Sequence, residues 1–235
     1  WLRAHGMQWM RGPWSFASQE WGLEIEGGHI PPVLMAPHNP AYYPAQLEAF
    51  GLTKIKDLLA YYVDAREGYT FPERFLLLTD KVQQRYGIRV RTLDMKHIEE
   101  DVQRVVEVSN LSIADNWGYY PVTVDEGKAM ARDLKQIIHP KGVLFAEDSQ
   151  GRAVGFAIAL PDVNVLLKGM NGRLLPFGWL KLAWGLPRLK QYRMWALGVI
   201  PEYQGRAIDT LLYRRLYEEL FSPELRMEVN YVLED

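Results

Sequence analysis

The sequence has no cysteine in 235 residues, which excludes a disulfide framework, a thiolate metal site and a cysteine nucleophile together. Because a cysteine-free chain suits a reducing compartment, we expect a cytoplasmic protein. A strong net charge is missing too, since 27 Lys and Arg stand against 29 Asp and Glu for a net charge of -2. Without the positive field that non-specific nucleic-acid binding needs, we expect no nucleic-acid partner. No apolar run reaches the ~18 residues of a membrane-spanning helix, so no transmembrane segment is expected.

The signatures of several enzyme classes are also absent. There is no Gly-x-Ser-x-Gly elbow, no His-Glu-x-x-His helix and no Gly-x-x-x-x-Gly-Lys-Ser/Thr loop. The histidines show no metal-ligand spacing, so we expect no metal site. They are His5, His29, His38, His97 and His139.

The composition is that of a chain with a packed core. Hydrophobic residues make up 48% of it, with 8 Trp, 13 Tyr and 8 Phe, and at ~150 residues per domain its length lies between one and two domains. The first part is rich in Pro, Gly and Trp, whereas from residue 88 onward strand-like and helix-like patterns alternate regularly. We therefore predict a front unit over residues 1–68, a linker with a short helix over 69–87, and a second unit over 88–235.

The second unit begins with a predicted strand over residues 88–93, where apolar and polar side chains alternate. Two amphipathic helices follow. The first has an apolar stripe from Ile98 to Ser109, and the second starts at the Thr-x-x-Glu capping box of Thr123 and Glu126. Residues 143–147 and 154–160 flank a polar turn with a Gly, which indicates an antiparallel hairpin.

Residues 165–190 mix Leu and Trp with Lys and Arg, interrupted by Gly and Pro. Basic residues beside Leu and Trp are typical of a helix on a membrane surface. The alternative is an insertion that packs over the edge of the sheet and lines a pocket for an apolar or mixed acceptor. We favour the second interpretation, because Gly and Pro break the helical periodicity.

The segment that carries chemistry is a strand over 193–200, a turn over Pro201–Arg206 and a helix over 207–221. A strand that passes through a small-residue turn into a helix leaves several amide N–H groups without helical partners, with the positive end of the helix dipole behind them. Such a turn predicts a phosphate site, to which Arg206 could add an ion pair. An ordinary strand-turn-helix unit with a chance basic residue is the alternative.

The stretch from Val199 to Leu212 resembles the coenzyme A binding motif of the GNAT acyltransferase superfamily, with Gln204, Ala207 and Asp209 at its key positions. The order of elements over 88–235 is also similar. The resemblance implies an α/β (α+β) fold with a mixed, largely antiparallel sheet flanked by helices, and acetyl-CoA or coenzyme A as co-substrate. It implies cofactor-binding residues on the motif strand and turn. These are Leu197, Gly198, Val199, Gln204, Gly205, Arg206, Ala207, Ile208 and Asp209.

Two residues depart from the motif. Ala207 stands where Gly is usual, and a positive φ there would cost a residue with a Cβ about 1 kcal/mol or more. Asp209 stands where Gly or Ala is common, and its carboxylate would repel a diphosphate unless it pointed away. Both changes weaken the expectation of tight cofactor binding.

By the resemblance, the function is N-acyl transfer from acyl-CoA to an amine, with a small-molecule or amino-acid-like acceptor. Glu228 and Glu234 on the predicted last strand are candidate bases. Asp115, Asn116, Asp162 and Asn164 stand at loop or strand ends that could face the acceptor. For each of these six residues the alternative, which we favour, is a solvated or capping role. The alternative function is a catalytically degenerate domain that binds coenzyme A or has a structural role.

The front of the chain resembles the closing part of the same fold. Residues 38–51 form a predicted helix carrying Tyr42 and Tyr43, and residues 54–63 form a strand. Either tyrosine is a candidate for the one that protonates the leaving thiolate; the alternative, which we favour, is that both stack against the helix in a structural role. A further strand is predicted over Gln8–Trp14. We therefore expect a partial GNAT-like unit before the second one, a tandem protein cut at both ends, and a homodimer or an intramolecular pseudo-dimer.

Overall fold

The computed structural model describes residues 1–14 and 21–234. They contain a six-stranded sheet in the order β1-β6-β5-β4-β3-β2, in which only β5 and β6 are parallel neighbours. The strands are β1 (Leu58–Asp64), β2 (Arg89–Thr92), β3 (Val143–Glu147), β4 (Ala153–Pro161), β5 (Gln191–Val199) and β6 (Arg226–Leu233). The predicted mixed, largely antiparallel sheet is confirmed.

The core lies around the hairpin of β3 and β4, where Phe145 pairs with Phe156. Both strands are almost wholly buried, because helices cover both faces of the sheet. Strands buried on both faces show continuous apolar runs rather than alternation, as in Val143–Ala146 and Val154–Leu160. The predicted hairpin is confirmed.

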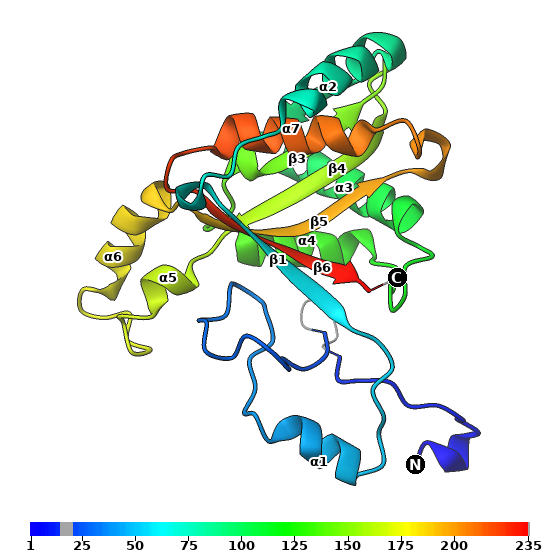
Figure 1. Ribbon diagram of the computed structural model, residues 1–235, viewed down its shortest axis with the longest axis vertical. Coiled ribbons are helices and arrows are strands. Elements are labelled where there is room, and N and C mark those ends of the chain that lie inside the picture. Colours follow the sequence, from blue (N-terminus) through cyan, green and yellow to red (C-terminus); the bar gives the residue numbers. More distant parts are fainter. Residues whose placement is uncertain (15–20, 235) are drawn as a thin grey trace.

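Figure 1 shows α2 and α7 in front of the sheet and α3 and α4 behind it. These helices are α2 (Glu73–Tyr86), α3 (Ile98–Ser112), α4 (Val124–Leu134) and α7 (Ile208–Leu220). The predicted capping box is present, since the Thr123 and Glu126 side chains each bind the other's backbone amide. The amphipathic patterns therefore located the helices correctly.

The front of the chain contributes to the same sheet. The predicted helix and strand are present but shorter than predicted, since α1 spans Tyr43–Ala49 and β1 begins at Leu58, and β1 pairs antiparallel with β6. The strand predicted over Gln8–Trp14 is wrong: residues 7–13 are irregular, and Trp14 forms only an isolated bridge with Trp21. Pro13 has no N–H to donate to a strand ladder. The division into two units with a linker over 69–87 stays a prediction.

Short helices make up the remaining elements. Within 165–190, α5 and α6 project from one end of the sheet (Figure 1). The elements are η1 (Arg3–His5), η2 (Ala65–Glu67), η3 (Pro140–Gly142), α5 (Asn164–Leu167), α6 (Gly178–Gly185), η4 (Leu186–Arg188) and η5 (Pro201–Tyr203).

Candidate functional site

Strands β5 and β6 separate along their length. They pair only from Gln191 with Arg226 to Met194 with Val229, although β5 continues to Val199 and β6 to Leu233. Figure 1 shows the two strands diverging toward their carboxyl ends. Beyond Met194, the edge of β5 that faces β6 therefore has no strand partner among the described residues.

A bulge on each strand marks the point where they part. On β5, Trp195 is the extra residue in the pairing with β4. On β6, Asn230 and Tyr231 together face Ala60 of β1. Bulges bend a strand and increase its local twist, so these two account for the split.

At the open end of the split, the chain turns into α7. The amides of Gly205, Arg206, Ala207, Ile208 and Asp209 donate no hydrogen bond to any described residue. The turn is held by its own chain, since Gln204 Nε2 donates to the Val199 carbonyl at 2.9 Å. Five successive free amides thus lie at the positive end of a thirteen-residue helix, an arrangement that suits an anion, and this segment is called the cradle below. The phosphate site itself stays a prediction.

Ala207 has the left-handed conformation that usually requires glycine. Its φ is 57° and its ψ 31°, and it is the N-cap of α7 without a side-chain cap. Ala207 therefore has the positive φ considered in the sequence analysis, and its Cβ makes this conformation less favourable by ~1 kcal/mol or more. Gly205, with φ 71°, takes the other left-handed position of the turn without that cost.

Arg206 lies beside this cradle. Its guanidinium stacks between two aromatic rings, 4.8 Å from the Tyr203 centroid and 5.3 Å from that of Tyr86. The Tyr203 hydroxyl donates to Asp148 at 3.2 Å, which fixes one of the rings. A cation held in this way is already ordered before an anion arrives. Its ion pair with a phosphate stays a prediction.

A cavity of about 420 Å³ occupies the split, with walls from α3, α4, β4, β5 and β6. Its lining is mostly apolar and includes Leu197, the only predicted cofactor-binding residue that lines it. Gly198 faces α3 instead, where a Cβ would collide with the Ser112 hydroxyl and come within 2.9 Å of Phe156. The glycine thus allows α3 to approach the strand closely, a role that the motif alone did not predict.

Polar groups gather where the strands part. Arg193 is fully buried, and it donates from Nε to Asn230 Oδ1 at 2.8 Å and from Nη1 to the Leu34 carbonyl at 2.6 Å. It lies over the Tyr231 ring at 5.2 Å. The Tyr231 hydroxyl is buried without a hydrogen-bond partner among the described residues, and this side chain lines the large cavity. Burial raises the pKa of Tyr231, and the Arg193 charge opposes that shift.

A second cavity, of about 210 Å³, lies under residues 30–33. Glu228, Asp162 and Asn164 line it, so the structure brings together three residues predicted from separate places in the sequence. Burial raises the pKa of Asp162, whose Oδ1 accepts from the Leu34 amide at 3.0 Å. Asn230 donates its side-chain N–H to Glu228 and also lines the large cavity, so it connects the two spaces.

Other predicted site residues lie elsewhere. Glu234 accepts from the Asp57 amide at 3.1 Å, at the exposed end of β6. Tyr42 and Tyr43 are exposed beside each other at the start of α1, and neither lines either of the two cavities described above. Asn116 lines the large cavity, whereas Asp115 does not. The catalytic roles of Glu234, Tyr42 and Tyr43 stay predictions for which this geometry gives no support.

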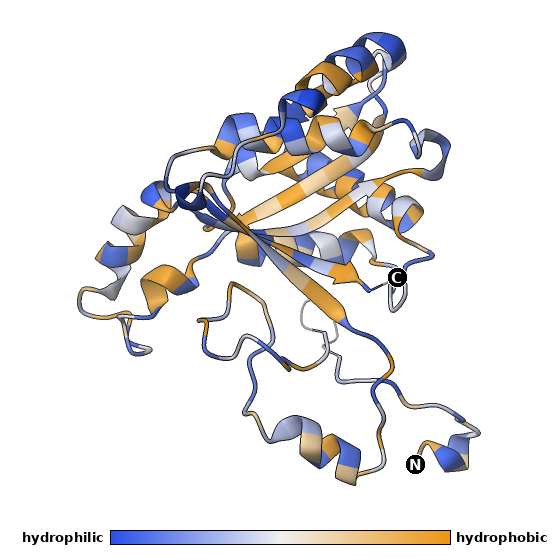
Figure 2. Ribbon diagram, viewed as in Figure 1, coloured by the Kyte–Doolittle hydropathy of each residue, from blue (hydrophilic) through white to orange (hydrophobic). Residues whose placement is uncertain are grey.

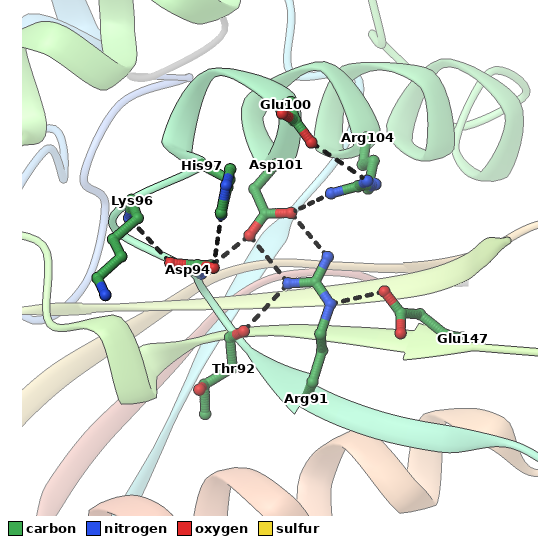
Figure 3. Close-up of polar contacts among 9 residues, drawn as sticks. All are labelled: Arg91, Thr92, Asp94, Lys96, His97, Glu100, Asp101, Arg104 and Glu147. Atoms are coloured by element: carbon green, nitrogen blue, oxygen red, sulfur yellow. Dashed lines mark hydrogen bonds and ion pairs between the residues drawn. The ribbon is translucent and has the colours of Figure 1, made fainter. Parts of the chain in front are cut away.

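An ion network around the buried Asp101 lies in the cavity wall at the start of α3 (Figure 3). Arg91 binds both carboxylate oxygens of Asp101, at 2.7 and 2.9 Å, and also Glu147 at 2.6 Å. Asp101 further accepts from Arg104 at 2.6 Å and from the Asp94 amide at 2.9 Å. Burial acts to raise the pKa of Asp101, but the bonds from Arg91, Asp94 and Arg104 hold it below its ordinary value. The sequence analysis did not identify this network.

The sequence of the chain is similar to those of two named bacterial proteins. It is 34% identical over 244 aligned residues to "Bacterial ceramide synthase" of Caulobacter vibrioides and 32% identical over 242 to "Protein YghO" of Escherichia coli. Each alignment covers 100% of this chain but only 62% and 61% of those proteins, so the chain spans about six-tenths of their length. No profile of a known protein family matches the chain.

Solved structures give the fold. A GCN5-related glucosamine N-acetyltransferase region of a fungal multi-domain GH3 β-N-acetylglucosaminidase superposes with a TM-score of 0.50 at 13% identity, over 80% of this chain and 20% of that one. A GCN5-related N-acetyltransferase from Sphaerobacter thermophilus gives 0.49 at 14%, over 81% of this chain and 47% of that one. A superposition at this identity shows the fold alone: this chain has the GNAT fold, a mixed, mostly antiparallel sheet flanked by helices.

Proposed function

We propose that this protein is an acyl-CoA-dependent N-acyltransferase. The observation that carries the proposal is the split between β5 and β6, with five free amides of residues 205–209 at its open end. An extended pantetheine arm would pair with the free edge of β5 at Leu197–Val199, as an added strand does. Its pyrophosphate would then reach the amides at the start of α7.

We further propose that the acceptor is a long-chain amine. The relative from Caulobacter vibrioides is named a ceramide synthase, and a ceramide is a long-chain amino alcohol acylated on its nitrogen. The cavity of about 420 Å³ is mostly apolar and lies within the usual range for ligand sites, ~300–1,000 Å³. The neighbouring cavity adds the carboxyl groups of Asp162 and Glu228, which would attract an ammonium group.

The chemistry assigned to this site is direct acyl transfer. The amine nitrogen attacks the thioester carbonyl carbon, a C–N bond forms, and the C–S bond breaks. We assign the amine's proton to Glu228, which Asn230 orients by donating to it. Tyr231 would protonate the leaving thiolate, because its hydroxyl has no other partner among the described residues, its side chain lines the cavity, and a tyrosine is protonated at neutral pH.

Calorimetric titration of coenzyme A tests the binding step. We expect saturation at one site, and Asp209→Asn should tighten binding about two- to fivefold, because it removes a negative charge beside the diphosphate. Asp125→Asn is the matched control, since Asp125 occupies the first turn of α4 and lines neither cavity. No saturation at millimolar coenzyme A would refute the proposal.

Thiol release from acyl-CoA tests the chemistry. We expect release with a long-chain amino alcohol such as sphinganine and far less with short amines. Glu228→Gln and Tyr231→Phe should each lower kcat by about 10²-fold or more while coenzyme A still binds. Binding without thiol release from any amine would favour the non-catalytic alternative instead.

A further inference from the structure

Residues 163–190 differ in charge from the rest of the chain. The segment contains no Asp or Glu, whereas the whole chain has a net charge of -2. Its basic residues are Lys168, Arg173, Lys181, Arg188 and Lys190. All of these except the half-buried Lys190 are exposed. One projecting segment therefore concentrates positive charge on a protein that is otherwise acidic.

The same segment exposes large apolar side chains. Leu175, Phe177 and Trp184 are each more than 70% exposed, and Trp179 is 50% exposed. Val165, Leu167, Leu174 and Leu180 add to this surface. Figure 2 shows hydrophobic and hydrophilic residues interleaved along α5 and α6, which project away from the sheet. Such a concentration of exposed apolar side chains marks an interaction surface.

We propose that residues 163–190 dock on a bilayer surface that contains anionic phospholipid. Trp and Leu beside Lys and Arg suit the boundary between lipid headgroups and acyl chains, where aromatic rings settle and basic groups meet lipid phosphates. A protein partner fits less well, because the cores of protein interfaces are depleted of Lys. None of the helices over residues 1–14 and 21–234 has the length and apolar character of a membrane span.

The docking segment also borders the small cavity. Asn164, Val165 and Lys168 line that cavity together with Glu228. If the acceptor is a long-chain amine, which rests on the proposed function, a docked protein would present this cavity to the lipid layer. The amine would then reach Glu228 without leaving the bilayer for water. Docking itself depends only on the charge and exposure of 163–190.

Flotation of the full chain with vesicles tests the proposal. We expect binding to mixed phosphatidylcholine and phosphatidylglycerol vesicles, and much weaker binding to phosphatidylcholine alone. Phe177→Ser with Trp184→Ser should reduce binding about tenfold or more. Trp9→Ser with Phe50→Ser is the matched control, because both residues are at least as exposed but lie at the front of the chain. This control should bind as the wild type does.

Several outcomes would overturn the proposal: no vesicle binding, equal binding to both vesicle types, or equal loss in the two double variants. A second copy of the chain would cover this surface if three results came together. The wild type would bind no vesicles and would be dimeric by light scattering, and the variant with Phe177→Ser and Trp184→Ser would be monomeric. Coenzyme A titration distinguishes the docking proposal from the proposed function. If the variant with Phe177→Ser and Trp184→Ser binds coenzyme A as the wild type does, its fold is intact and its loss of vesicle binding is specific. Vesicle binding without coenzyme A binding would leave docking standing and refute only the proposed function.

Discussion

Replacement of Gly198 by Ala tests how α3 and β5 are held together at the split. An added Cβ would collide with the Ser112 hydroxyl oxygen and lie 2.9 Å from Phe156 Cε1 and 3.0 Å from Ser112 Cβ. Real Cβ atoms do not approach so closely, so the end of α3 must move away from β5. Overpacking of this kind costs ~1–3 kcal/mol, and the lower backbone entropy of Ala returns ~0.5–1 kcal/mol. We expect Gly198→Ala to lower the free energy of unfolding by about 1–2 kcal/mol.

A second substitution, Ser112→Ala, should restore stability to the Gly198→Ala variant. Ser112 Oγ is buried and has no hydrogen-bond partner among the described residues, so Ser112→Ala removes an unpaired polar atom and should be close to neutral. The same change removes the nearest atom to the added Cβ. The double variant should therefore recover part of the lost stability, with a coupling energy of about 1 kcal/mol, while the contacts with Phe156 and the Cβ of residue 112 remain.

Urea unfolding followed by tryptophan fluorescence gives the free energy of unfolding of the wild type, the two single variants and the double variant. Gly28→Ala is the control, because its Cβ would meet Glu24 at an ordinary distance of 3.7 Å. Coenzyme A affinity should fall in Gly198→Ala and return in the double variant, since displacement of α3 changes the wall of the split. The reasoning fails if Gly198→Ala unfolds like the wild type, or if Ser112→Ala brings no rescue.

Two further predictions concern the turn and the ion network around Asp101. Ala207→Gly should raise the free energy of unfolding by ~1 kcal/mol, because the left-handed position no longer holds a Cβ, and coenzyme A titration should show tighter binding. Asp101→Asn should lower the free energy of unfolding by about 2–3 kcal/mol in urea, because the charge-assisted bonds from Arg91 and Arg104 are weakened while Arg91 keeps its ion pair with Glu147. Since the folded-state pKa of Asp101 is lowered, its contribution is fully present above the ordinary carboxyl pKa of ~4 and is lost as pH falls through the folded pKa. The variant should therefore lose stability less steeply in acid than the wild type, and an equal or steeper acid loss would contradict this account.

Local patterns in the sequence predicted the elements well, because their signals lie within the elements themselves. The capping box set the start of α4, and the polar turn between β3 and β4 indicated their hairpin. The pairing of β1 with β6 carried no such signal. Tyr61 lies opposite Val229, more than a hundred residues later in the chain, and alternation within β1 does not identify its partner.

The parts of the candidate site that have a local signal in the sequence could be predicted, and the parts that depend on long-range contacts could not. The free amides follow from a local turn, and Glu228 could be proposed from its place on a strand. Arg193 was missed, although a charged residue within an otherwise apolar strand is itself a signal of a buried polar group. Asp101 was missed because it stands among acidic residues in the first turn of α3, where a carboxylate normally needs no partner beyond the helix dipole. Only the fold shows that this one is buried beside Arg91.

The two bulges link the fold to the proposed chemistry. Without them, β5 and β6 would continue as paired strands, and the edge of β5 would have no room for an extended ligand. With them, the first unpaired residues of β6 are Asn230 and Tyr231, which thereby reach the cavity wall. Arg193 is then buried beside both, where it bonds to Asn230 and lies over the Tyr231 ring. The irregularity that opens the ligand site is thus also the one that places the proposed proton donor within it.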